Sequence, residues 1–216
     1  TADGRREILG LDVGDSEVSV GANCGECFPT ALNLGGAALS INAGRLVVGD
    51  GVFPSTIHAG RITVQANEVQ VRDTSSITAV ATGEALRVSG TSGNTKTFIN
   101  ENVSSGGLIT PNGRWRVWAT DPRDSQNFQP GGLVQDFTQY DAQFGQSNPL
   151  GSGNGFLFSL APKLTLTGPA GITKVYDGTT TVTPAIDLDL IQFTGLLAGD
   201  SLKGTFSADG VEYTDK

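Results

Sequence analysis

Two cysteines stand close together in Cys24-Gly-Glu-Cys27, a spacing shared by zinc sites, redox sites and short disulfide loops. A closed zinc site needs four ligands, so a chain with two Cys and one His would have to add carboxylates or a second subunit. A thioredoxin-like redox site needs a helix after the motif, but Phe28-Pro29 follows it here. The third interpretation is a disulfide, or a pair of inert thiols, in a surface loop.

Carboxylates form the second group that could do chemistry, because a pair of acids in a surface groove can cleave polysaccharides. The candidates are Asp12, Asp15, Glu17, Asp50, Asp73, Asp121, Asp124 and Asp136. Nothing in their spacing forces any pair to a catalytic distance, and Asp commonly forms turns. The sequence has a single histidine, His58, and no GxSxG motif. We therefore predict no catalytic residue, no metal and no cofactor, and keep a carbohydrate-active β-helix enzyme as an alternative.

The segment Arg114-Trp-Arg-Val-Trp118 is the richest candidate for ligand contact. In a strand, Arg114, Arg116 and Trp118 share one face, while Trp115 and Val117 share the other. The outward stripe of Arg114, Arg116 and Trp118 could stack on a sugar or pair with a carboxylate. The inward pair is expected to cap the apolar end of a core.

The elements that would position these residues are short strands that repeat. Each copy reads apolar, any, apolar, any, small, and then Asn, Gly or Thr. The copies begin at Val18, Leu39, Leu46, Ile62, Val69 and Leu86, with a looser one at Ile77. Successive copies at Val18, Leu39, Ile62 and Leu86 lie 21, 23 and 24 residues apart, and the spacing of Leu46 and Val69 is also 23. A period of this length, made of strands and turns, indicates coils that stack on one another.

The predicted fold class is therefore all-β: a right-handed parallel β-solenoid, or β-helix, followed by a small β module. The alternative is an antiparallel β-sandwich, which is also built from short strands at regular spacing. That alternative requires hairpin turns between neighbouring strands, and Ala43-Gly44 and Asn67-Glu68 are short enough to be such turns.

The composition divides the chain into three parts. Residues 1–120 are the solenoid segment. Residues 121–163 are rich in Asp, Gln, Asn, Gly and Pro with isolated aromatics, which predicts an irregular extension or linker. Residues 164–216 return to alternation and are expected to form a partial β module, near the lower size limit for folding alone.

The charge narrows the range of partners. The chain has 216 residues and a formal net charge of −8. Nucleic-acid binders need a basic surface, so we expect no nucleic-acid partner. No apolar run reaches the roughly 18 residues that span a bilayer.

Several motifs in order resemble the C-terminal side of filamentous-haemagglutinin-like adhesins, exoproteins of Gram-negative bacteria exported by two-partner secretion. The first group is Phe98-Ile-Asn100, Gly113–Pro122, Phe137-x-x-Tyr140 and Gly153–Leu160. In addition, Lys174-Val-Tyr-Asp-Gly-Thr-Thr180 and Leu196-Leu-Ala-Gly-Asp200 look like parts of a YDG module, a repeat common in the tails of those exoproteins.

The resemblance implies a structural or adhesive segment of a protein that is secreted to the bacterial cell surface. The implied partners are an outer-membrane translocator pore and a glycan or protein on a host or bacterial surface. We expect a monomer, and secretion into an oxidising space favours a disulfide between Cys24 and Cys27. A third alternative, besides the adhesin and the enzyme, is a module that binds a host protein or a haem carrier.

Overall fold

The computed structural model describes residues 8–12, 17–20, 30–89, 97–104, 106–167 and 192–196. The chain forms two compact units, Thr1–Ala161 and Pro162–Lys216. Every helix or strand among the described residues is a β-strand, which confirms the all-β prediction. In this described part there is no helix long and apolar enough to cross a membrane.

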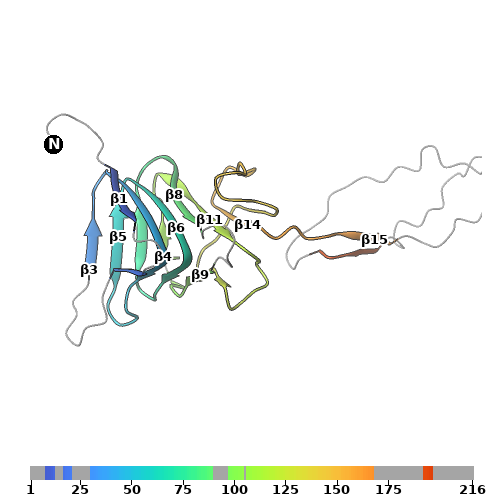
Figure 1. Ribbon diagram of the computed structural model, residues 1–216, viewed down its shortest axis with the longest axis horizontal. Coiled ribbons are helices and arrows are strands. Elements are labelled where there is room, and N and C mark those ends of the chain that lie inside the picture. The colour runs from blue at the N-terminus through green and yellow to red at the C-terminus, as the bar shows by residue number, and fades with distance from the viewer. Residues whose placement is uncertain are drawn as a thin grey trace, which may run out of the picture. The chain divides into compact units, whose positions relative to one another are not determined.

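The first unit consists of strands that pair in parallel. The first series runs through β1 (Ile8–Asp12), β4 (Ala38–Val48), β6 (Arg61–Val71), β8 (Gly83–Ser89), β11 (Gly113–Ala119), β14 (Gly155–Phe158) and β13 (Phe137–Gln139). The second series is β3 (Thr30–Asn33), β5 (Ser55–Ala59), β7 (Ser76–Ala79) and β10 (Leu108–Ile109). In addition, β2 (Glu17–Val20) pairs with β4, β9 (Thr97–Asn100) with β6, and β12 (Phe128–Gln129) with β9. Figure 1 shows β4, β6, β8 and β11 side by side.

The register of these strands follows the sequence repeat. Leu39 pairs with Ile62 and Ile62 with Leu86, while Leu46 pairs with Val69. The parallel pairing is that of the predicted sheets and not of the antiparallel alternative. Ala43-Gly44 and Asn67-Glu68 lie inside the continuous strands β4 and β6, so they are not hairpin turns.

One part of the predicted alignment is wrong. The sequence spacing places Val18 in line with Leu39, but β2 pairs its Val18 with Leu46. The residue in line with Leu39 is instead Leu9 of β1. The first series therefore begins one strand earlier than the sequence pattern suggests.

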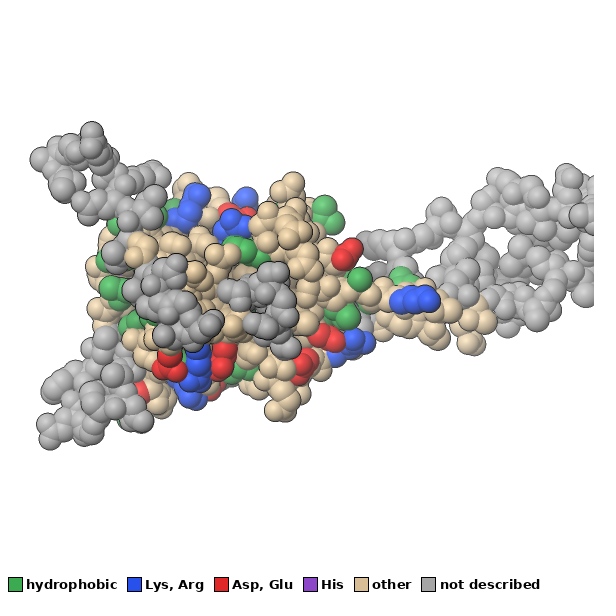
Figure 2. Space-filling model, in the orientation of Figure 1, with side chains coloured by type: hydrophobic (Ala, Val, Ile, Leu, Met, Phe, Trp, Pro, Cys, Tyr) green, Lys and Arg blue, Asp and Glu red, His purple; other side chains and the backbone are tan. Residues whose placement is uncertain are grey.

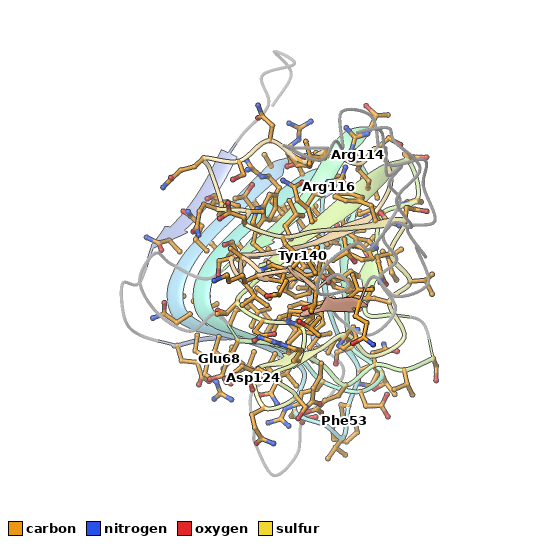
Figure 3. The ribbon with its side chains drawn as sticks, turned by 90° about the vertical axis from the view of Figure 1, so that its right-hand side faces the viewer. Phe53, Glu68, Arg114, Arg116, Asp124 and Tyr140 are labelled. Atoms are coloured by element: carbon orange, nitrogen blue, oxygen red, sulfur yellow. The ribbon has the colours of Figure 1, made fainter. Side chains whose placement is uncertain are left out.

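The long strands β4 and β6 change direction at matching positions. In β4, Gly44 and Arg45 are successive partly exposed residues between buried Ala43 and Leu46, and β6 repeats this at Asn67 and Glu68. Because two successive residues face outward, the alternation of inward and outward side chains shifts by one residue at this point. The inward residues before and after it can therefore line two different sheet faces. The curvature of these strands is visible in Figure 3.

The core of the first unit is aliphatic along most of its length. Ile57, Ile62, Val64, Ile77 and Leu86 have no exposed surface. They belong to one cluster that continues along the parallel sheets as far as Phe158.

Buried polar residues tie the turns beside this core together. The Asn102 side-chain amide donates to the Ser75 carbonyl at 2.9 Å, and the Asn100 amide donates to the carbonyls of Gly106 and Pro130 at 2.7 and 2.9 Å. Ser75 Oγ accepts from the Ser55 amide at 3.1 Å. These bonds satisfy buried groups and hold the loops 49–54, 72–75, 101–107 and 130–136 next to one another.

The far end of the core is aromatic. Phe128 meets Phe156 and Phe158 edge-on at 5.0 Å each, and Trp115 packs on Phe156 at 5.0 Å. Tyr140 stacks on Phe158 at 5.9 Å. Residues 121–161 therefore belong to the first compact unit. Of the two expectations for this stretch, the irregular extension describes it and the linker does not. Its spaced aromatics, which lack strand periodicity, are what complete the core.

In the second unit, the described residues form one antiparallel pair, β15 (Thr165–Thr167) with β16 (Gln192–Thr194). The unit starts at Pro162, two residues before the boundary expected at residue 164.

Candidate functional site

The structure separates the two faces of the Arg–Trp segment as the strand alternation predicts. Trp115 and Val117 of β11 belong to the main core cluster. Trp118 belongs to a second, smaller cluster with Ala142 and Leu157. Arg114 and Arg116 lie close together in Figure 3, well apart from Glu68 and Asp124.

The expected exposure is wrong for two residues of the outward stripe, whereas Arg114 stays partly exposed. Arg116 and Trp118 are each only 1% exposed, because the chain around β13 lies over this face. The Arg116 guanidinium lies 4.6 Å from the centre of the Phe137 ring. Trp118 meets the edge of Phe144 at 5.0 Å. We call residues 137–154, which carry Phe137 and Phe144, the aromatic cover.

A second arginine, Arg87, contacts aromatic rings of both β11 and the aromatic cover. The Arg87 guanidinium lies 5.3 Å from the Trp118 ring centre and 4.6 Å from that of Phe144. Its Nε also pairs with Glu84 Oε1 at 2.8 Å. Cation–π contacts of this kind stabilise partly desolvated arginines, so the cover is held by rings on guanidinium groups as well as by apolar packing.

The electrostatics of Arg116 reflect its burial. Burial lowers the pKa of Arg116, and the neighbouring Arg114 lowers it further, while the Glu84 and Asp136 carboxylates oppose this shift. An arginine remains charged in proteins despite such shifts, so the guanidinium needs polar partners. One is the Gly151 carbonyl, which accepts from Arg116 Nη2 at 2.8 Å.

Glycines allow the aromatic cover to lie this close to the sheet. A Cβ added at Gly151 or Gly155 would clash with the Phe137 ring, and one at Gly153 with the Asp136 carboxylate. The Asp136 carboxylate accepts a bond from the Asn154 amide at 2.6 Å. Sequence reasoning missed Phe137 and Phe144 as covering residues; the alternating glycines of residues 151–155 were the signal of a close backbone approach.

The candidate carboxylates near expected strand ends each hold a local turn. Asp50 accepts from the amides of Val52 and Phe53 at 2.8 Å, and these backbone bonds lower the pKa of Asp50. Asp73 accepts from the Thr74 amide at 2.9 Å.

The later candidates behave in the same way. Asp121 pairs with Arg123 at 2.8 Å, and this bond lowers the pKa of the Asp121 carboxyl. Asp124 accepts from the Gln126 amide and the Asn127 side chain at 3.1 and 2.7 Å. These carboxylates are therefore turn formers with occupied oxygens.

A mixed charge ladder runs across β2, β4 and β6. Arg45 pairs with Glu17 and with Glu68, at 2.9 Å each, and donates to Gln70 at 2.8 Å. Glu101 accepts from Gln70 and from Arg72, again at 2.9 Å each. Burial opposes the charge of Arg45, but the bonds to Glu68 and Glu17 outweigh it and raise the Arg45 pKa. Figure 2 shows acidic and basic side chains gathered next to one another.

The remaining candidates yield no reactive group. His58 shares a hydrogen bond of 3.1 Å with its register partner Asn33, on the outward side of β5. Within the described ranges, no three His, Cys, Asp or Glu side chains come together as metal ligands. Cys24, Cys27 and Asp15 lie outside the described residues, so the disulfide stays a prediction.

Comparison with known proteins gives one finding. Residues 161–216 match the family model of the YDG domain, so this part of the chain is similar to that family. The match confirms the YDG part of the resemblance carried by Lys174–Thr180 and Leu196–Asp200. No curated protein and no solved structure matches the chain.

Proposed function

We propose that the chain is a structural and adhesive segment of a secreted bacterial surface exoprotein of the two-partner-secretion type, without catalysis of its own. In this proposal, residues 8–160 form a right-handed parallel β-solenoid, and an outer-membrane translocator pore exports the protein. The observation that carries the proposal is the repeated parallel register, which stacks Leu39, Ile62 and Leu86 at one inward position. A YDG-like module follows this stack along the chain.

The repeated register supports a role in extending the protein. In a stack of coils each coil contacts only its neighbours, so adding coils adds length without a new core design. The register partners Leu46 and Val69, both nearly fully buried, show how neighbouring coils share one core. A long stack of this kind suits a protein that must reach beyond a cell surface.

The bonding of the candidate acids supports a non-catalytic role. A glycosidase needs one carboxyl free to donate a proton and another free to attack or activate water. Asp121 is instead held by Arg123, and Asp136 by the Asn154 amide. The carbohydrate-active alternative therefore receives no support from these pairs.

With Arg116 and Trp118 of the stripe covered, the exposed loops are the better candidates for contact with a surface ligand. Val52, Val103 and Val134 are 74%, 70% and 81% exposed, and Phe53 is 39% exposed. They lie on three loops that buried polar bonds hold together: Asn102 and Asn100 link loops 72–75, 101–107 and 130–136, and the Ser55 amide links the end of loop 49–54 to Ser75. We call Val52, Phe53, Val103 and Val134 the loop row, and Figure 3 labels Phe53 at the margin of the molecule.

The test is adherence of beads coated with the whole purified chain to host epithelial cells and to bacteria, together with a glycan array. Replacing Val52, Phe53 and Val103 by Ser should reduce adherence severalfold. Leu150→Ser is the matched control, because Leu150 is 86% exposed but lies on the aromatic cover.

Adherence that survives the triple substitution would contradict the contact role of the loop row. Absence of any binding by the unaltered chain, to cells or glycans, would contradict the adhesive role. Turnover of a bacterial or plant polysaccharide that is abolished by Asp136→Asn would favour the enzyme instead.

A further inference from the structure

The strands at both ends of the parallel stack pair along one edge only, and at the far end these are β10, β12 and β13. The two ends differ in how the core next to them is covered. We call β1, β2 and β3 the N-terminal coil. Each of its strands pairs along one edge, β1 and β2 with β4 and β3 with β5. Among the described strands, none pairs with the opposite edges. An open edge presents a row of N–H and C=O groups that can accept a further strand.

The side chains of the N-terminal coil are also less buried than those of the coils behind it. Val18 and Leu32 pack against the core but remain partly exposed. Their register partners Leu46 and Ile57 have no exposed surface. Because the backbone register continues unchanged across these pairs, the difference reflects the absence of a neighbouring layer among the described residues.

The opposite end of the stack is closed by rings. Phe128, Phe156 and Phe158 contact one another, and Tyr140 stacks on Phe158. Their irregular positions do not repeat the aliphatic alternation on which another coil would stack. A stack whose two ends differ in this way has a direction. One end is closed by a terminal cap, and the other can bind a further layer.

The charge ladder shows what the missing layer would carry. Arg45 of β4 lies between Glu17 of β2 and Glu68 of β6, so the ladder alternates in sign from coil to coil. Glu17 is 46% exposed in its side chain and stands at the open end of this alternation. The next residue in the ladder would be basic.

We infer that the N-terminal coil is the docking surface for one more parallel β-coil of the same exoprotein, with aliphatic residues facing inward and a Lys or Arg opposite Glu17. The inference rests on the proposed function, which it deepens by giving the stack a direction. The aromatic end then terminates the solenoid before the YDG-like unit.

The chain itself supplies a suitable probe coil. A copy of residues 38–60 is placed directly before Ile8, in place of residues 1–7. Ile8 and Arg61 are both register partners of Ala38, so the copy leads into β1 as the original leads into β6. The copy of Arg45 then falls opposite Glu17. Docking should raise the thermal midpoint by roughly 5 °C and slow amide exchange in β1 and β3 by about tenfold.

Two matched fusions serve as controls. Leu39→Lys and Ile41→Lys within the copy should abolish both effects, because lysines cannot fill the inward positions. Arg45→Glu within the copy should weaken them, because it places two acids together. Should a fusion not fold, the peptide 38–60 added in trans replaces it, with exchange in β1 as the readout.

Unchanged exchange in β1 and β3 with the intact copy or peptide would overturn the inference, as would equal protection by the lysine version. The proposed function is judged separately, by adherence and by exchange in β4, β6 and β8. If those strands stay protected and the unfused chain adheres, failure of docking means only that the N-terminal coil does not accept another layer.

Discussion

The region around β4 and β6 and the region from β11 to β14 share one core but fill it differently. The first region repeats small aliphatic side chains in register, such as Leu39 on Ile62. The second uses large rings from irregular positions, such as Trp115 on Phe156. Repetition lets a stack continue, whereas rings drawn from several loops close it. The following predictions test this difference, beginning with the largest expected effect.

Phe156→Ala should destabilise the first unit by about 3–5 kcal/mol, because it removes a buried ring that contacts three other aromatics. Ile62→Val, in the aliphatic region, should cost only about 0.5–1.5 kcal/mol. Urea unfolding followed by tryptophan fluorescence measures both. Equal losses of unfolding free energy would show that closure by the aromatic end contributes no more to stability than the aliphatic region does.

Gly155→Ala should destabilise by about 1–3 kcal/mol, since the new methyl group forces the Phe137 ring away from Arg116. Gly36→Ala is the control: an added Cβ there meets nothing within 4 Å. Thermal unfolding compares the two variants. A Gly155 variant as stable as the control would mean that the aromatic cover is loosely placed.

These two regions also differ in what the sequence could reveal. The parallel pairing of Leu39, Ile62 and Leu86 was predictable, because a fixed spacing of matching residues implies stacked coils. Val18 was misaligned because β1 and β2 are separated by a connection, whereas their partner positions in β4 are continuous, and the apolar pattern carries no information about such connections.

The covered stripe illustrates a second limit of the sequence pattern. Alternation correctly separated Trp115 from Arg116, since it depends only on neighbouring residues. It could not show that Phe137 and Phe144, more than twenty residues later, would cover the outward face. Contacts between irregular segments that are far apart in the chain follow no sequence period, so the residue pattern cannot predict them.

In the aliphatic region, Arg45→Met should cost about 1 kcal/mol or less, because the pairs with Glu17 and Glu68 are more than one-third exposed and screened by water. The loss should shrink as salt is added, which urea unfolding at low and high ionic strength would show. A loss that does not change with salt would indicate that the packing of the side-chain stem is what matters.

The smallest effect is expected from Asp121→Asn in the segment before the aromatic cover. The bond from Arg123 lowers the folded-state pKa of Asp121, so its contribution to stability is present above the unfolded value and is lost as the pH falls through the folded value. The stability of the wild type should therefore exceed that of the variant near about pH 7, and the difference should be smaller near about pH 3, below the unfolded value. Urea midpoints at both values measure this, and a difference that grows in acid would contradict the assignment.

The parallel register itself is tested most directly by cross-linking cysteines in a chain whose Cys24 and Cys27 have been replaced by Ser. In the stacked arrangement, Ser40 is the register partner of Thr63. A hairpin at Ala43-Gly44 would instead bring Ser40 opposite Val47. A short bifunctional thiol reagent, with the products mapped by mass spectrometry, should join Ser40→Cys to Thr63→Cys and leave Ser40→Cys with Val47→Cys unlinked. The reverse result would contradict the stack of parallel coils.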